Sequence, residues 1–188
     1  TNPMSLSPKP IYYAQLGDQS VDNGANYLVP NNSLSDYVFD FDGNNQYLQV
    51  PDSNDLSFGN SSTDSPFSIS AWINMDSNAY FRIVNKYDAP NYEYQFDTGA
   101  SGELRFFVLD GTGYRGRTGS TLNTGQWYHV VATYSGVGGS AAQNGTKIYI
   151  NGANVVGSTS TFGSYTAMSN TTAPVYIGRI GTSYANGQ

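Results

Sequence analysis

Short runs of aromatic and β-branched residues, separated by turn-forming residues, constrain the fold of this chain more than any other feature. Runs such as FSISAWI (67–73) and WYHVVATY (127–134) alternate apolar with polar positions, which is the period of a half-buried strand. Turn signals such as Asp42-Gly43 and Asn151-Gly152 fall between the runs, and no window has a helical period. The pattern predicts an all-β fold of two packed antiparallel sheets, with no more than single turns of helix.

Alternation also predicts which side chains share a face. In the segment YEYQFD (92–97), a regular strand would place the three aromatic rings on one face and Glu93, Gln95 and Asp97 on the other. The two tryptophans, Trp72 and Trp127, each lie in an apolar run, which favours positions in the core.

Composition limits both the architecture and the partners. A chain of 188 residues fits one domain over 1–188, with a first strand over residues 11–16. There is no cysteine, so disulfides and thiolate metal sites are absent. The net charge is −6 and no basic patch is visible, which argues against nucleic acid and against an anionic membrane surface. No apolar run approaches the roughly 20 residues that span a bilayer, so membrane insertion is not expected.

Five blocks in a fixed order carry a family resemblance. They are FDFDG (39–43) with YLQVP (47–51), FSISAWI, WYHVVATY, KIYING (147–152) and VYIGR (175–179). Together they resemble the laminin-G-like, concanavalin A-like lectin/glucanase family, in its bacterial and viral branch, over about residues 36–180. The resemblance implies a jelly-roll β-sandwich at an extracellular location or on a cell or virion surface.

The chain departs from the family at its end. Members usually follow the "IGR" strand with a block like F-x-G-x-I-D-E-V-x-I, which closes a sheet beside the first strand. This sequence reads YANGQ over 184–188, so the resemblance implies that the closing strand is lacking. An open edge strand invites pairing with a second chain, which predicts self-association there.

Catalysis is not expected. Retaining glycosidases need two carboxyl groups about 5–5.5 Å apart, and glucanase relatives carry them in a Glu-x-Asp-x-Glu pattern. This chain has two glutamates, Glu93 and Glu103, ten residues apart, and lacks that motif. Asp40 and Asp42 share a face only if their strand is regular, and Asp42 is better explained as a turn residue. His129 is the single histidine and is best explained as a half-buried sheet residue with a hydrogen bond.

A structural calcium ion is the one cofactor that the resemblance implies. Related jelly rolls hold calcium near the sandwich edge, with ligands from the early Asp-Gly region and from the acidic closing strand. Asp42 and the carbonyl of Gly43 match the first set, whereas the closing acidic residues have no counterpart here.

Carbohydrate binding is the leading functional hypothesis, with a glycan or a glycosylated surface as the partner. Aromatic rings stack on sugars while polar side chains bind the hydroxyl groups, and 16 tyrosines supply rings with polar tips. Two neighbouring segments combine such residues, and the candidate binding residues are Tyr80, Arg82, Lys86, Tyr87, Asn91, Tyr92, Tyr114, Arg115 and Arg117.

Two other functions stay open. The chain could be a structural or adhesive module of a larger surface or phage-tail assembly that binds no sugar, because a fold does not fix a function. A glycoside hydrolase of the same fold is the third hypothesis, and the missing glutamate motif argues against it.

Overall fold

The computed structural model describes residues 38–78 and 80–181. Contacts between residues divide the chain into two units, Thr1–Asp40 and Phe41–Gln188. The strand expected over 11–16 lies outside the described residues, so the single-domain organisation over 1–188 stays a prediction. Every strand of the described part of the chain belongs to the second unit.

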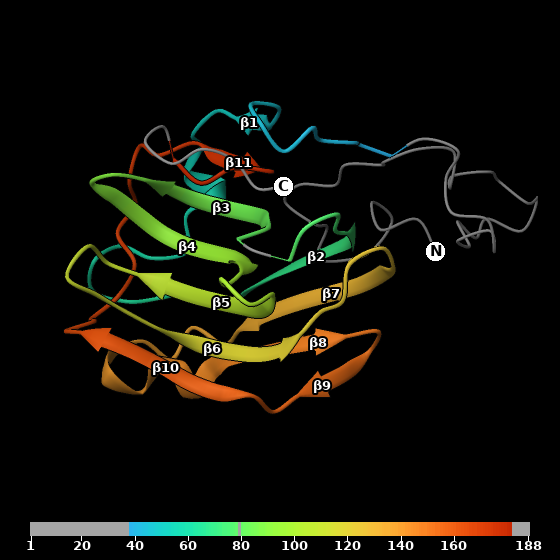
Figure 1. Cartoon of the computed structure of the whole chain (residues 1–188). Coiled ribbons are helices and arrows are strands. Elements are labelled where there is room, and N and C mark those ends of the chain that lie inside the picture. Colours follow the sequence, from blue (N-terminus) through green and yellow to red (C-terminus); the bar gives the residue numbers. More distant parts are fainter. Residues whose placement is uncertain (1–37, 79, 182–188) are drawn as a thin grey trace, which may run out of the picture. The chain divides into compact units, whose positions relative to one another are not determined.

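The larger sheet contains seven strands in the order β1-β11-β3-β4-β5-β6-β10, and all neighbours run antiparallel (Figure 1). Three of its members, β3, β4 and β5, form its centre, while β1 and β10 are its outermost strands within the described residues. The strands are β1 (Leu48–Val50), β3 (Arg82–Asp88), β4 (Asn91–Thr98), β5 (Glu103–Leu109), β6 (Gly113–Thr121), β10 (Ser158–Gly163) and β11 (Val175–Ile177).

The smaller sheet has the order β2-β7-β8-β9 and is also antiparallel. Its strands are β2 (Phe67–Asn74), β7 (Trp127–Tyr134), β8 (Thr146–Ile150) and β9 (Ala153–Val155). The helical segments in the described part of the chain are two 3₁₀ helices, η2 (Asn54–Leu56) and η3 (Gly139–Gly145). With seven residues, η3 is longer than the single turn that the sequence predicts. The expected two-sheet antiparallel β-sandwich is therefore confirmed, and the runs at 67–73 and 127–134 form β2 and β7.

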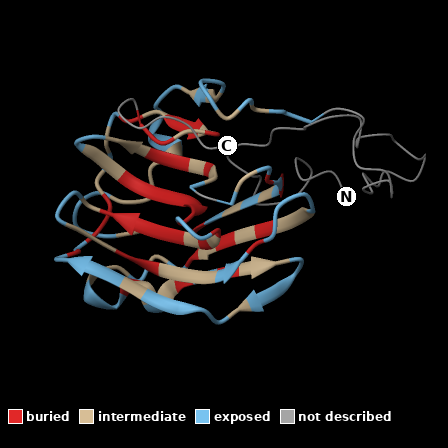
Figure 2. Cartoon of the chain, in the orientation of Figure 1, coloured by how far each residue is buried: buried red, intermediate tan, exposed pale blue. Residues whose placement is uncertain are grey.

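The hydrophobic core lies between the two sheets. Phe67 of the smaller sheet contacts Tyr94 and Phe106 of the larger one, with ring centroids 5.1 and 5.7 Å apart. Val130 and Ile148 of the smaller sheet are fully buried in the same cluster. Burial is densest along β3, β4 and β5 (Figure 2), so packing into the core holds these central strands of the large sheet from one side.

Two register shifts in the pairing of β3 with β4 change which face a side chain occupies. Between Arg82 and Val84 the pairing advances two residues on β3 for one on β4, so Ile83 is the extra residue. Ile83 joins the core cluster and Val84 packs against it, while Arg82 stays opposite Asp97 on the other face.

The second shift lies between Lys86 and Tyr87, where Glu93 of β4 is the extra residue. Tyr87 and Tyr92 are thereby paired on the face away from the core, and their ring centroids lie 4.5 Å apart. The strict alternation expected for residues 92–97 holds for Tyr94, Gln95, Phe96 and Asp97, but it is wrong for Tyr92 and Glu93. A single inserted residue reverses the side-chain alternation beyond it.

Two further expectations concern exposure and edges. Trp72 was expected in the core, but 52% of its surface is exposed, because it lies on the outward-facing positions of β2. Among the described residues β1 pairs only with β11, and β2 pairs only with β7. In the same part of the chain, no helix is long and apolar enough to cross a membrane.

Candidate functional site

The candidate site is the side of the seven-stranded sheet that faces away from the core, here called the outer face. Phe96 and Phe106 point into the core, so their strand neighbours Gln95, Asp97 and Phe107 point outwards. Pairing aligns Asp97 with Arg105, and Gln95 with Phe107, across β4 and β5. The outer face thus combines charged, amide and aromatic side chains over the strands whose other side is most deeply buried in the core.

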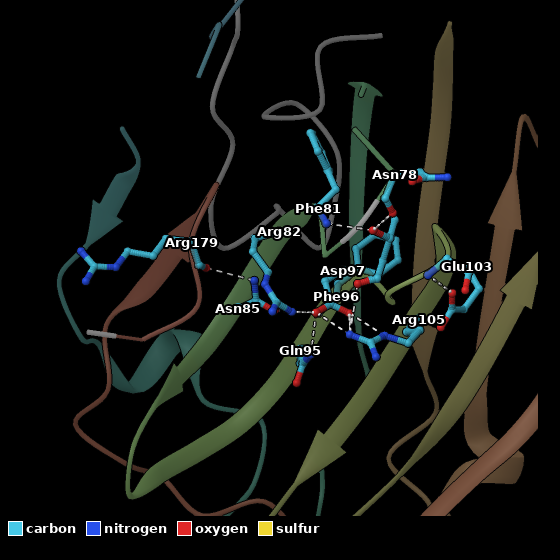
Figure 3. A network of polar contacts seen from close by, with 12 residues as sticks. Asn78, Phe81, Arg82, Asn85, Gln95, Phe96, Asp97, Glu103, Arg105 and Arg179 are labelled. Carbon is cyan, nitrogen blue, oxygen red and sulfur yellow. Dashed lines mark hydrogen bonds and ion pairs between the residues drawn. The ribbon is translucent and has the colours of Figure 1, made fainter. Parts of the chain in front are cut away.

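Asp97 is the centre of a network of charged groups on this face (Figure 3). Arg105 donates to it from β5, with Nε 3.0 Å from Oδ1 and Nη2 2.9 Å from Oδ1 and 3.0 Å from Oδ2. Arg82 donates from β3 through Nη1 to Oδ2, and Gln95 donates from the same strand as Asp97 through Nε2 to Oδ2 at 2.6 Å. Both oxygens of Asp97 are therefore occupied by donors of the chain itself.

Burial and charge act on Asp97 in opposite directions. Its side chain has no exposed surface, and this burial raises the pKa of Asp97 above its ordinary value, while Arg105 and Arg82 counteract the rise. The side chains of Arg82 and Arg105 are 12% and 19% exposed. The two guanidinium groups thus hold the carboxylate between them and still reach the surface.

Tyr80 lies over the two arginines. The guanidinium carbon of Arg82 is 5.1 Å from the centre of its ring, and that of Arg105 is 5.9 Å from the same ring. Tyr80 adopts a φ of 56°, an uncommon backbone conformation for a residue with a side chain. The turn before β3 therefore directs an aromatic ring onto the charged end of the outer face.

Two groups of aromatic rings on the outer face are together called the aromatic band. One of their rings, Phe107, adjoins the charged network, because its centre is 5.7 Å from the guanidinium carbon of Arg105. Tyr87 and Tyr92 form one contact pair on β3 and β4. Phe107 and Tyr114 form a second pair on β5 and β6, at 4.9 Å, and Phe162 of β10 stacks on Tyr114 at 5.8 Å. Phe162 is 66% exposed. Asp97 and Tyr92 are five residues apart on β4, or about 17 Å along a strand, so the aromatic band and the charged network can contact one extended ligand.

Polar side chains between the two ends are tied to the backbone. Asn85 is fully buried, its Nδ2 donates to the carbonyl of Arg179 at 3.1 Å, and its Oδ1 accepts from the N–H of Phe96 at 3.2 Å. The guanidinium of Arg179 lies 4.5 Å from the ring centre of Tyr47 and 5.8 Å from that of Tyr176. These contacts fix the segment after β11 against the centre of the sheet.

Five of the nine predicted binding residues lie on or over the outer face, namely Tyr80, Arg82, Tyr87, Tyr92 and Tyr114. Asn91 pairs with Asp88 where β3 meets β4, at the end of that hairpin.

The other three predicted residues, Lys86, Arg115 and Arg117, have their charged groups on internal oxygen atoms. Arg115 donates to the carbonyls of Phe162 and Gly163 at 2.9 and 3.0 Å. Arg117 donates through Nε to the carbonyl of Thr146 at 3.1 Å. These contacts, together with those of Lys86 described next, hold the three charged groups away from the outer face.

Lys86 forms a second charged network, between the sheets and the loops that border them. It is fully buried, and its Nζ lies 2.6 Å from Asp52 Oδ1, 2.5 Å from the carbonyl of Ala173 and 3.4 Å from Glu93 Oε1. Glu93 Oε1 also accepts from the N–H of Thr171 at 2.8 Å. Burial raises the pKa of Glu93, although these donors and Lys86 act against the rise. The network fastens the loops around 52 and 171 to the large sheet.

The predicted calcium ligands form a turn. Asp42 Oδ1 accepts from the N–H groups of Asn44 and Asn45 at 2.9 and 3.3 Å, and Gly43 has a φ of 69°. The hydrogen bond from Asn44 lowers the pKa of Asp42. Over residues 38–78 and 80–181, no three His, Cys, Asp or Glu side chains gather where they could hold a metal ion. Calcium binding by Asp42 and Gly43 therefore stays a prediction.

His129 lies on the outward-facing side of the smaller sheet. Its Nε2 is 2.9 Å from Ser70 Oγ, and its ring centroid is 5.1 Å from that of Trp72, the residue directly opposite. It is the half-buried, hydrogen-bonded sheet residue that the sequence indicates.

Comparison with known proteins identifies the family. Residues 42–188 match the family profile of the concanavalin A-like lectin/glucanases superfamily. This match covers most of the chain. The chain belongs to the concanavalin A-like lectin/glucanase superfamily. The two-sheet antiparallel sandwich agrees with that membership, whereas a search of curated proteins found no match.

Five residues of the outer face in this superfamily domain are not among the predicted binding residues. They are Gln95, Asp97, Arg105, Phe107 and Phe162. Alternation within residues 92–97 was the available signal for Gln95 and Asp97, since it assigned both to the polar face. No comparable signal pointed to Phe162, whose place beside Tyr114 depends on the pairing of β10 with β6, about 50 residues apart in sequence.

Proposed function

We propose that this chain is a non-catalytic carbohydrate-binding module whose glycan lies across the outer face of the seven-stranded sheet. The observation that supports it most is the aromatic band of Tyr87, Tyr92, Phe107, Tyr114 and Phe162, which adjoins the arginine–aspartate network on the same face. Rings with an apolar body and a polar tip suit the faces of sugars, and a few fixed polar groups orient the ligand. Superfamily membership makes a glycan partner reasonable.

The strands under the site are packed into the core before a ligand binds, which favours a preformed site over induced fit. The band rests on β4 and β5, whose opposite sides are packed into the core through Phe96 and Phe106. Side chains on such strands lose little further freedom when a ligand binds, which lowers the entropic cost of binding. We place the protein outside the cell or on a cell or virion surface, where such modules meet glycans.

The same geometry supports the absence of hydrolysis. A glycosidase needs a carboxylate that is open to substrate and a second carboxyl group at a fixed distance from it. Both oxygens of Asp97 already accept hydrogen bonds from Arg82, Gln95 and Arg105. Release of reducing ends from laminarin or agarose by the wild-type chain, abolished in Asp97→Asn, would overturn this part of the proposal.

The test of binding is a glycan array probed with the whole chain, once with calcium and once with a chelator. We expect specific binding that Tyr92→Ala weakens about fivefold or more, since alanine substitution of a stacking aromatic ring costs roughly 1–3 kcal/mol in ligands where it has been measured. Tyr149→Ala is the matched control, because Tyr149 is half-buried on the outward side of the smaller sheet. Binding lost in Tyr149→Ala and kept in Tyr92→Ala would move the site to the other sheet, and a blank array would contradict the proposal.

A structural or adhesive role is the second candidate, and one observation favours it. Trp72 is 52% exposed beside His129 on the smaller sheet, and large exposed aromatic side chains are typical of protein interfaces. Self-association through an edge strand belongs to this alternative. Sedimentation of the wild-type chain as a dimer, and of Trp72→Ser as a monomer, would support it.

A further inference from the structure

The outer face carries more positive charge than its own carboxylate balances. Seven of the eight basic residues fall in the described part of the chain. Lys86, Arg115 and Arg117 are bound internally, and Lys147 is exposed on the smaller sheet. Arg179 donates through Nε to the carbonyl of Gly181 at 2.6 Å and lies over the rings of Tyr47 and Tyr176. Arg82 and Arg105, by contrast, share the single carboxylate of Asp97. Two cations and one anion leave one positive charge at this end of the face.

A second carboxylate on β5 does not pair with these arginines. Glu103 is two residues before Arg105, and its Oε2 accepts from the N–H of Ser101 at 3.0 Å. This neutral donor leaves the charge of Glu103 in place, but that charge is not in ion-pair contact with Arg82 or Arg105. Within the described residues, Asp97 is the carboxylate that forms ion pairs with Arg82 and Arg105. A partly buried charge without a partner is costly, so an anion from outside would stabilise the site.

One guanidinium edge also has an unused donor. Nη1 of Arg82 is bound to Asp97, whereas its Nε is buried and has no hydrogen-bond partner. A buried N–H without an acceptor is rare in folded proteins and calls for an explanation such as a ligand group. The Nε and Nη2 atoms form the side of the guanidinium that matches the two oxygens of a carboxylate or a sulfate.

We propose that the outer face binds an anionic saccharide, with a carboxylate or sulfate group of the sugar on the Nε–Nη2 edge of Arg82 and the neighbouring sugar rings on the aromatic band. This inference rests on the proposed carbohydrate-binding function and specifies its ligand class. Tyr80 lies over the guanidinium groups of the arginines and is 47% exposed, so we infer that its side chain shifts when the anion reaches the buried Nε. The ring then packs against the bound sugar.

The experiment compares polymers that differ only in charge. The probes are polygalacturonate and its carboxyl-reduced form, and a sulfated galactan and its desulfated form, titrated calorimetrically into the whole chain at two salt concentrations. We expect at least tenfold tighter binding to one charged polymer than to its neutral form, the size expected of a charge-assisted hydrogen bond. Whether the carboxylated or the sulfated member binds identifies the source of the anion.

Three variants test the residue assignment. Arg82→Gln is expected to abolish the preference for the charged polymer, and Lys147→Gln, with the same change of charge on the other sheet, is expected to keep it. Arg82→Lys keeps a cation beside Asp97 and therefore protects folding, but it lacks the forked edge and is expected to reduce the preference severalfold.

The remaining outcomes each contradict a stated part of the proposal. Equal binding to charged and neutral polymers overturns this inference and leaves the proposed function intact. A charge preference that survives in both Arg82 variants shows non-specific attraction and also overturns it. No binding to any of the four polymers, together with a blank glycan array, contradicts both proposals.

Discussion

Replacing the buried carboxylate Asp97 tests the charged network most directly, and Asp97→Asn is the smallest change that does so. The variant keeps the shape of the side chain and one acceptor oxygen, but it leaves the guanidinium groups of Arg82 and Arg105 facing each other without an anion. Removing one partner of a buried ion pair costs about 3–5 kcal/mol. The arginine side chains are 12% and 19% exposed, so solvent offsets part of the loss, and we expect about 3 kcal/mol.

Urea unfolding followed by tryptophan fluorescence measures this change. With a typical slope of about 1–3 kcal/mol per molar urea, a loss of about 3 kcal/mol lowers the midpoint by about 1–3 M. Asp55→Asn is the matched control, because it makes the same chemical change at an exposed side chain of η2, and we expect it to stay within about 0.5 kcal/mol of wild type.

A double-mutant cycle separates the ion pair from the other contacts of Asp97. Arg105→Met should destabilise the Asp97→Asn background less than it destabilises wild type, because the repulsion between the two guanidinium groups is relieved. A loss below about 1 kcal/mol in Asp97→Asn, with two-state curves of unchanged slope, would contradict this explanation. The negative charge of Asp97 would then contribute little to the free energy of unfolding.

Three more predictions concern other parts of the sandwich. Lys86→Met should lower the free energy of unfolding by about 3 kcal/mol or more in urea titrations, because it leaves the carboxylates of Asp52 and Glu93 without their cation; an unchanged midpoint would contradict this. Partial burial raises the pKa of Asp110, but hydrogen bonds from the N–H groups of Thr166, Thr112 and Gly113 outweigh the burial, and the net effect is a lowered pKa. The charged form of Asp110 therefore stabilises the fold above the unfolded pKa, and this stabilisation is lost as the pH falls through the folded pKa. Asp110→Asn should therefore flatten the stability profile at acidic pH, below about pH 4, and a profile parallel to wild type would count against it. Trp72→Ala should cost less than about 1 kcal/mol and Phe106→Ala about 3–5 kcal/mol in thermal unfolding, because Trp72 is half exposed and Phe106 fully buried; similar losses would place Trp72 in the core after all.

The fold class and the positions of most strands could be predicted from local patterns in the chain. The runs at 67–73 and 127–134 form β2 and β7 almost residue for residue, because alternation with a period of two reports directly on a sheet that is buried on one side. The block at 47–51 contains β1, while residues 39–43 form no strand in the described structure.

Part of the candidate site was also available from the sequence. Tyr80, Arg82 and Tyr114 belong to segments rich in tyrosine and arginine that flank strands, and all three lie at the outer face. Composition made arginine and tyrosine the natural candidates, but it could not distinguish Arg82, which reaches that face, from Arg115, which donates to backbone carbonyls of β10. Both are arginines at strand positions, and only the register of pairing tells them apart.

The side of the sheet on which each polar residue lies depends on the packed structure. The extra residues Ile83 and Glu93 shift the alternation along β3 and β4, which brings Tyr92 to the outer face and turns Glu93 towards Lys86. Such shifts depend on which strand lies beside which, and the pairing of β11 with β3 joins residues about 90 apart in the chain. Local patterns record the period of a strand, whereas its register and faces are fixed by partners far away in sequence.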